Sequence, residues 1–357
     1  MDYPYGVGFQ IIHTPLLPLD NVNPGEGRFS VRTSMRGINV WSIQTNRYIT
    51  DGEEGQLEPS VRYALTNKLQ IGMSIPFSGR GGGFMDNSIE IFHRSVGVTQ
   101  GQRDRYPQNR FNTSYEPLSQ YYPLFDNDPF TAYFARNYDR REYPRKEYDQ
   151  PLTLSLSTDK IRKLFVNKFF PYLNEYKTED IAAANYDAIA GGNPKAHLQF
   201  TLWEGNSFIN RITAGSQIKI PVKTVELIAT PGTDISTFAV FHKKAVKGKL
   251  DMKLGISYSY FQIHQYRNLS LRGNLWVFRP SLVYNFSPWQ FHFEYVYYPS
   301  PILNWGRLSV PTHQIGLGIS KKFENYLCQF GIFENIITYS NTPDFVILVS
   351  LEKFALN

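Results

Sequence analysis

Apolar and polar residues alternate strictly over several long stretches of this chain, and this pattern limits the possible folds more than any other feature. From 249 to 260 six apolar residues alternate with polar or small ones. From 289 to 297 five aromatic residues face one way, while Gln290, His292 and Glu294 face the other. Period-two alternation is typical of a strand with one apolar and one polar face. The sequence therefore predicts long amphipathic strands.

Aromatic residues make up 15% of the chain, and many lie near the ends of these alternating runs. The clearest examples are Tyr258, Tyr260, Trp276, Phe286, Tyr295 and Tyr297. Rings at the ends of apolar strand faces are typical of the aromatic girdles of a transmembrane barrel. A soluble sandwich would instead fill its apolar face with Val, Ile and Leu. We predict a membrane barrel, with a soluble barrel as the alternative.

Composition excludes several other classes of protein. The high aromatic content excludes a disordered chain, and no apolar run approaches the roughly 18 residues that a transmembrane helix requires. Cys328 is the single cysteine, so no intramolecular disulfide or thiolate metal cluster can form. We expect no cofactor and no metal. The first residues lack a basic segment followed by an apolar core, so we expect no signal peptide in this numbering.

The spacing of the strands supports a barrel. Twelve strands can be drawn, at 27–44, 57–66, 69–77, 196–205, 211–221, 235–245, 249–261, 275–286, 289–298, 313–323, 326–334 and 344–354. Short connections alternate with long ones, which we place at 45–56, 78–195, 222–234, 262–274, 299–312 and 335–343. Short turns on one rim and long loops on the other are typical of outer-membrane barrels. We predict an all-β, antiparallel, up-and-down transmembrane barrel of 12 strands, with 10 to 14 possible, that forms a single domain over 1–357.

The connection 78–195 is too long for a bare loop, and we predict that it is a partly helical insertion that folds in or over the lumen. Asp86 is placed to cap a helix over 84–96 that has Ile89, Phe92 and Val96 on one face. A second helical stretch is predicted at 158–190, with Ile161, Leu164, Phe165 and Phe169 on one side.

Several motifs together resemble an uncharacterised family of bacterial outer-membrane barrels, a domain of unknown function. They are Thr-Asp-Gly-Glu at 50–53, the glycine-rich start and helix at 79–94, the Gly-Gln-Arg-Asp to Asn-Arg-Phe stretch at 101–111, and the ending at 334–345. The resemblance covers nearly the whole chain and implies a barrel in the outer membrane, without an activity to carry over. The stretch 158–190 and the ending after Phe354 depart from the family pattern.

Polar residues of the predicted lumen are the first candidates for a functional site. Those of the insertion, as a plug or constriction, are Asp86, Glu90, His93, Arg94, Arg103, Asp104 and Arg110. Those on strand faces toward the lumen are Asp251, Lys253, Gln290, His292 and Glu294. Mixed charges at a narrowing can select a solute. The alternative is that they form internal ion pairs that brace the loop against the barrel wall.

A second candidate site is an external loop rich in arginine and tyrosine. Its basic residues are Arg136, Arg140, Arg141, Arg145 and Lys146, and they lie among Tyr138, Tyr143 and Tyr148. Guanidinium groups can grip lipopolysaccharide phosphates in bidentate geometry, whereas the alternative is a solvated loop whose charges pair with one another. The net charge of +6 is small and dispersed, so we expect no nucleic-acid partner.

Enzyme motifs are weak. His292 beside Glu294 is one conceivable catalytic pair, but alternation places both in the lumen, where a structural polar network is the better interpretation. The acidic residues at 126–128 lack the glycine and the terminal glutamate of a calcium loop. We do not expect an enzyme.

The sequence favours a monomeric, porin-like channel or uptake protein for small solutes in the outer membrane of a Gram-negative bacterium, with 79–111 as plug or constriction. The alternative is a sealed structural barrel that binds lipopolysaccharide or a partner protein through its external region. A lipid-modifying enzyme at the rim has lower weight. Outer-membrane lipid, lipopolysaccharide and an unknown solute are the expected partners.

Overall fold

The computed structural model describes residues 24–44, 48–97, 108–109, 112–114, 189–205, 208–222, 232–266, 269–303, 309–335 and 344–356. They belong to two compact units. The first comprises residues up to Val40, then Glu54–Arg80 and Ala188–Asn357, and the second comprises Trp41–Glu53 and Gly81–Asp187. Among the residues described, no helix is both long and apolar enough to span a membrane.

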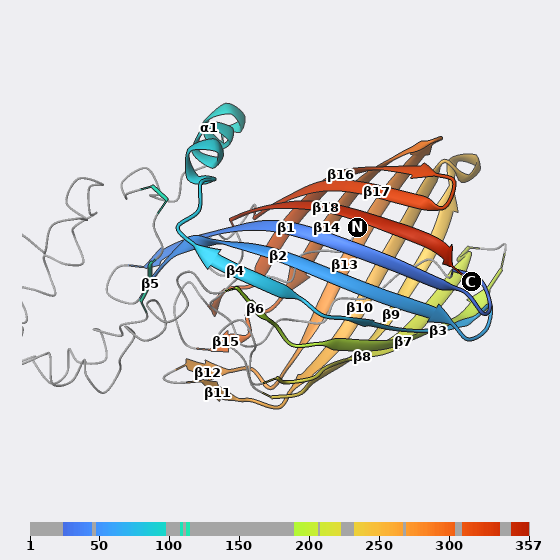
Figure 1. Ribbon diagram of the computed structural model, residues 1–357, viewed down its shortest axis with the longest axis horizontal. Coiled ribbons are helices and arrows are strands. Elements are labelled where there is room, and N and C mark those ends of the chain that lie inside the picture. Colours follow the sequence, from blue (N-terminus) through green and yellow to red (C-terminus); the bar gives the residue numbers. More distant parts are fainter. Residues whose placement is uncertain are drawn as a thin grey trace, which may run out of the picture. The chain divides into compact units, whose positions relative to one another are not determined.

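The first unit is a closed antiparallel barrel of twelve strands (Figure 1). The strands are β1 (Phe29–Gln44), β2 (Tyr48–Ala64), β3 (Leu69–Ser74), β7 (Lys195–Glu204), β8 (Arg211–Lys219), β9 (Asp234–Ala245), β10 (Leu250–Phe261), β13 (Asn274–Phe286), β14 (Trp289–Tyr298), β16 (Thr312–Phe323), β17 (Tyr326–Asn335) and β18 (Phe345–Leu356). Each pairs with its neighbour in chain order, and β1 pairs with both β2 and β18, which closes the ring. The predicted fold class and strand number are confirmed.

One predicted connection is wrong. The segment 45–56 was expected to be a long external loop, but β2 begins at Tyr48 and includes most of it. Acidic residues and glycines at 51–55 gave this part of the strand the composition of a loop. The inner face of a membrane barrel carries polar residues, so composition alone does not separate loop from strand there.

The wall between β2 and β7 is interrupted by two proline-containing breaks. Strand β4 (Phe77–Gly81) follows β3 after Pro76 and also pairs with β2, while β6 (Ile189–Gly191) precedes β7 before Pro194 and pairs with β4. Proline lacks the N–H that a ladder needs. The Gly192 amide nevertheless donates to the Pro76 carbonyl at 2.7 Å, so hydrogen bonding continues across the break. The barrel wall therefore extends into both ends of the predicted insertion.

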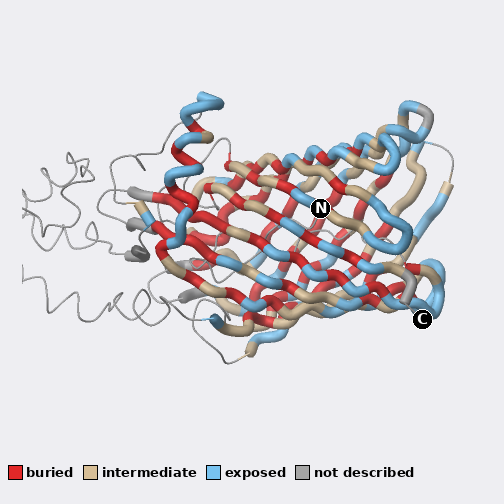
Figure 2. The backbone as a smooth tube through the Cα atoms, turned by 45° about the horizontal axis from the view of Figure 1, so that its top comes forward, coloured by how far each residue is buried: buried red, intermediate tan, exposed pale blue. Residues whose placement is uncertain are grey.

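Burial alternates along the strands, as Figure 2 shows. On β14 the side chains of His292 and Glu294 are buried, whereas Phe291 and Phe293 are 50% and 40% exposed. On β18 Ser350 and Glu352 are buried, whereas Val349 and Leu351 are exposed. The barrel therefore has its apolar residues outside and its polar residues inside, the reverse of a soluble barrel.

Short tight turns at 246–248, 287–288 and 324–325 connect strands at one end of the barrel. We call this the short-turn end. At the other end three short strands form a separate sheet: β11 (Gln265–Tyr266), β12 (Leu269–Leu271) and β15 (Ile302–Leu303). Two of the connections predicted to be long, 262–274 and 299–312, thus contain strands of their own.

The second unit contains helix α1 (Asp86–Val96), the last residues of β1 from Trp41 and the first residues of β2 up to Glu53. It also contains β5 (Asn112–Ser114), which pairs with β2. The helix lies where it was predicted, but its details differ. Met85, not Asp86, is the N-cap residue, and the buried face carries Asp86, Ile89, Glu90 and His93, whereas Val96 is exposed. The helix predicted at 158–190 lies outside the described residues. The division into one barrel domain with a single insertion stays a prediction.

Candidate functional site

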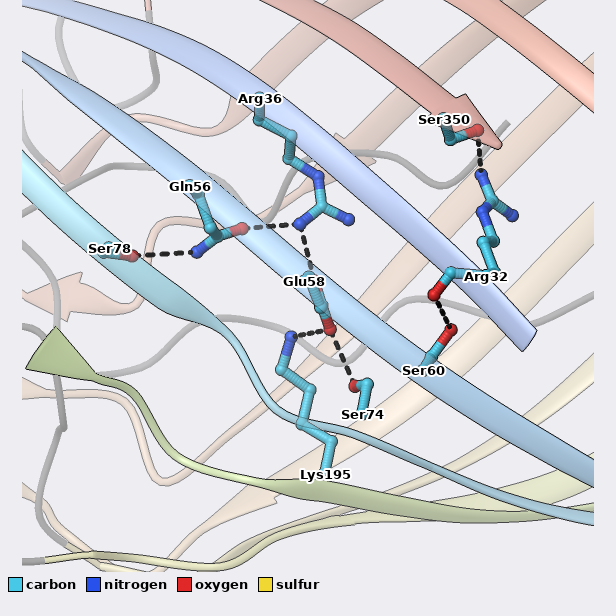
Figure 3. Close-up of polar contacts among 9 residues, drawn as sticks. All are labelled: Arg32, Arg36, Gln56, Glu58, Ser60, Ser74, Ser78, Lys195 and Ser350. Atoms are coloured by element: carbon cyan, nitrogen blue, oxygen red, sulfur yellow. Dashed lines mark hydrogen bonds and ion pairs between the residues drawn. The ribbon is translucent and has the colours of Figure 1, made fainter. Parts of the chain in front are cut away.

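The inner wall of the barrel carries an ion-pair cluster centred on Glu58 of β2, drawn in Figure 3. The Glu58 carboxylate accepts hydrogen bonds from the Arg36 guanidinium of β1 at 2.5 Å, from the Lys195 ammonium of β7 at 3.0 Å, and from the Ser74 hydroxyl of β3 at 2.7 Å. Arg36 also donates to the Gln56 side-chain oxygen at 2.5 Å. Glu58 therefore joins four adjacent strands of the wall through its side chain.

The ion pairs continue along β2 in both directions. Glu54, four residues before Glu58, accepts from Arg80 of β4 at 2.9 Å. Arg62, four residues after it, pairs with Glu352 of β18. Glu54 and Arg62 are eight positions apart on β2, which is about 26 Å along the strand. Charged pairs thus line this wall over much of the length of β2.

Arg32 extends the network toward the last strands of the chain. Its guanidinium donates to the Gln329 side chain of β17 at 2.8 Å and to the Ser350 hydroxyl of β18 at 3.0 Å. The Ser350 hydroxyl in turn donates to Gln329 at 3.1 Å. The Arg32 side chain therefore links β1 to β17 and β18 across the junction at which the barrel closes.

A second polar network lies on β10, β13, β14 and β16, opposite β1 and β2 in the strand order. His292 hydrogen-bonds to the Ser320 hydroxyl at 2.7 Å, and Ser320 donates to Gln290 at 3.0 Å. Gln290 donates to Asn285, whose amide reaches Asp251 at 3.3 Å. Three of the strand residues predicted to face the lumen are brought together by this network, namely Asp251, Gln290 and His292. The fourth, Glu294, forms a separate ion pair with Arg279 of β13.

His292 and Glu294 do not form the catalytic pair considered from the sequence. Glu294 accepts from the Arg279 guanidinium at 2.8 Å, whereas His292 bonds to Ser320. Within the part of the chain that the structure describes, the buried His292 Nδ1 atom has no hydrogen-bond partner, so no described carboxylate orients this ring as in a catalytic triad. The geometry is that of a structural polar network. Lys253, the fifth strand residue predicted to face the lumen, is half-buried on β10, on the same face of the strand as Asp251.

The predicted plug residues are only partly described. Asp86, Glu90 and His93 are buried on α1, and Arg94 is exposed. Asp86 accepts a hydrogen bond from the Asn109 amide at 2.6 Å, and Glu53 accepts one from the Met85 amide at the start of the helix. Arg103, Asp104 and Arg110 lie outside the described residues, as do Arg136, Arg140, Arg141, Arg145 and Lys146. The plug and external-loop assignments stay predictions.

The outer face carries two belts of aromatic residues. Toward the long connections, Tyr258 lies 4.9 Å from Trp276 and Tyr297 lies 5.1 Å from His313, measured between ring centroids. At the short-turn end, Phe286 and Phe291 stack at 4.8 Å. Trp276 and Phe286 are ten residues apart on β13, about 33 Å along the strand. At a strand tilt near 40° this separation is about 25 Å of height, the thickness of the apolar band of outer-membrane barrels.

Comparison with known families identifies the chain. It matches the model of DUF3187, described as a protein family of unknown function, over residues 10–123 and 172–354. The chain belongs to the DUF3187 family. This confirms the resemblance seen in the sequence to an uncharacterised barrel family. No curated protein matches the chain.

Solved structures give this DUF3187 member a fold relative. An outer-membrane channel from Pseudomonas putida F1 is similar over 94% of this chain and 99% of its own, with 9% identity and a TM-score of 0.51. At this identity the likeness shows the fold alone. Looser matches are the NanC porin, with 7% identity over 92% and 100% of the two chains and a TM-score of 0.43, and the Ralstonia pickettii toluene transporter TbuX, with 11% over 94% and 92% and a TM-score of 0.38.

Proposed function

We propose that the chain is an outer-membrane barrel of a Gram-negative bacterium and acts as a channel or uptake route for small solutes, without a catalytic role. The observation that carries this proposal is the reversed placement of side chains in a closed ring of strands. Val349 and Leu351 face outward beside buried Ser350 and Glu352. An apolar exterior suits the lipid, and a polar interior suits water and polar solutes. A fold relative that is itself an outer-membrane channel supports the proposal.

The polar wall favours a narrow passage. Arg36 and Glu58 are 4% and 6% exposed although they face the interior. A wide water-filled pore leaves such side chains exposed, whereas a smaller barrel can be filled by its own side chains. We therefore expect a small conductance. We also propose, from the sequence, that the segment 79–111 acts as a plug or constriction.

Conductance in planar bilayers tests the channel. The intact chain and a variant that lacks 84–111 are inserted separately, and single-channel currents are recorded in potassium chloride. We expect small or rare openings for the intact chain and larger, steadier currents for the deletion. A heat-modifiable band on gels serves as the control that each form is folded.

The alternative is a sealed structural barrel that binds lipopolysaccharide or a partner protein, and the low exposure of Arg36 and Glu58 favours it. If both folded forms insert and neither conducts ions, the channel is disproved and the sealed barrel remains. A chain that stays soluble without detergent would disprove the membrane assignment itself.

A further inference from the structure

Lysine side chains lie over aromatic rings on the outer face at the short-turn end. The Lys321 ammonium of β16 lies 4.7 Å from the centroid of the Trp289 ring of β14 and 4.5 Å from that of Phe323. Lys353 of β18 lies 5.5 Å from the ring of Tyr326 of β17. These distances are within the range of cation–π attraction. Each lysine is thus held beside a ring of a neighbouring strand or of its own.

A third lysine makes the same kind of contact at the short-turn end. Lys243 of β9 lies 5.4 Å from the ring of Phe208, which belongs to the short connection between β7 and β8. Between described residues, the cation–π contacts lie at the short-turn end and involve these three lysines. The belt toward the long connections has ring–ring contacts instead, such as Tyr258 with Trp276. The two belts therefore differ in the contacts that their rings make.

Register shows that the lysines continue the apolar outer face. Lys321 pairs with Cys328, and Cys328 pairs with Leu351, two residues from Lys353. Leu351, Val349 and Leu317 are each about half exposed on the same outward face. A cationic belt thus borders an apolar wall. A phospholipid has the matching order, with an anionic phosphate followed by acyl chains.

We propose that Lys321 and Lys353 bind the phosphates of anionic glycerophospholipids in the leaflet around the short turns. An ammonium group has three N–H donors, so a lysine beside a ring can still donate to a phosphate oxygen. Trp289 and Tyr326 suit the headgroup level, because rings with one apolar and one polar end are favoured there. Strands β16 and β18 lie two strand spacings apart, and the two lysines are offset by two residues along the strands, so their Cα atoms are about 12 Å apart. The inference rests on the membrane location proposed above but not on conductance.

Lipid binding to the full chain in detergent tests the inference. Phosphatidylglycerol or phosphatidylcholine is added at matched concentrations, and bound lipids are counted by native mass spectrometry. We expect a preference for phosphatidylglycerol. In a K321Q/K353Q variant, apparent affinity for phosphatidylglycerol should fall by about 10- to 30-fold, because each lysine near an anionic lipid surface contributes roughly a fivefold factor in affinity.

The matched control is K322Q/K249Q, which removes the same charge at the same end. Lys322 follows Lys321 but lies on the opposite face of β16, and Lys249 lies in the β9–β10 turn, both exposed. We expect this control to bind like the unchanged chain. An equal loss of phosphatidylglycerol affinity in the control would disprove the proposed binding site. Undiminished binding by K321Q/K353Q would also disprove it.

A competition experiment addresses the source of the phosphate. If lipid A displaces phosphatidylglycerol from the unchanged chain but phosphatidylglycerol does not displace lipid A, the assignment to glycerophospholipid is wrong. A heat-modifiable band confirms that every variant is folded. A chain that stays soluble without detergent would instead show that the membrane location is wrong. Failure of the lipid site can therefore be distinguished from failure of the membrane location.

Discussion

The Glu58 carboxylate on β2 accepts a hydrogen bond from the Lys195 ammonium on β7 at 3.0 Å, although 137 residues separate them in the chain. The pair connects the two strands across β3, and Arg36 reaches the same carboxylate from the other side. The chain leaves the barrel after β4 and returns at β6 between these residues. The ion pair therefore fixes the returning strand to the one that precedes the insertion.

Glu58→Gln should destabilise the barrel markedly. The change leaves Arg36 and Lys195 without the carboxylate that both contact, and loss of one partner from a buried ion pair costs about 3 to 5 kcal/mol. Urea unfolding of the protein in lipid vesicles measures the difference. Glu324→Gln, in an exposed turn, is the control and should change stability little. Equal stability of the two variants would contradict the role given to Glu58.

Leu282→Arg and Phe286→Arg should differ sharply even though both side chains are 39% exposed on the outer face of β13. Leu282 lies within the apolar band, where an outward arginine costs about 2 to 4 kcal/mol, whereas Phe286 lies at the belt, where the cost falls to about 0 to 1 kcal/mol. Folding free energies in vesicles provide the measurement. A soluble barrel would tolerate both changes equally, so equal costs would argue against the membrane location.

Gly215→Ala should impair folding of the β7–β8–β9 wall. An added Cβ would overlap the backbone carbonyl oxygen of Leu198 and the ring of Phe238, and the backbone oxygen cannot move aside by a rotamer change. Overpacking of this kind costs about 1 to 3 kcal/mol or more. Gly55→Ala on β2 is the control, because nothing lies within 4 Å of its Cβ position. Refolding yield and urea midpoint together measure the effect, and a normal midpoint for Gly215→Ala would contradict this packing.

Glu53→Ala should loosen the start of α1. The Glu53 carboxylate accepts from the Met85 amide, one of the amides that the helix itself leaves unsatisfied. Loss of such an acceptor costs about 0.5 to 2 kcal/mol of helix stability. Hydrogen exchange at residues 85–89 should become faster by about 2- to 30-fold. Asn87→Ala, at an exposed position, is the control, and unchanged exchange in Glu53→Ala would disprove the contribution.

Local pattern was enough to predict the barrel. Alternation on β10 and β14 depends only on residues two apart, so the faces of Tyr258 or His292 can be inferred without knowing any neighbour. The start of β2 was missed because Asp51, Gly52 and Glu53 have the composition of a loop. The face of α1 was partly missed for a similar reason, since charged Asp86 and Glu90 are buried there.

Partners on the inner wall could not be predicted from the sequence. Alternation placed Glu294 in the lumen, but its partner Arg279 follows from the β13–β14 register, which the sequence leaves undetermined by a few residues. The ion pair of Glu58 with Lys195 depends on the register of β7, the strand at which the chain returns to the barrel wall. Local alternation does not predict that register. The cation–π contact of Lys321 with Trp289 likewise needs the β14–β16 pairing.

The junction between β1 and β18 has a consequence for the order of folding. Arg32 and Ser350, which meet across this junction, are 318 residues apart in the chain. Contacts of such high sequence separation form late, since the entropy of closing a long chain segment is lost before they add stability. Until β18 pairs, β1 and β17 each leave one strand edge unpaired, and such edges are prone to aggregation. We expect β18 to be the final strand of the ring to pair, because it closes the barrel between β17 and β1.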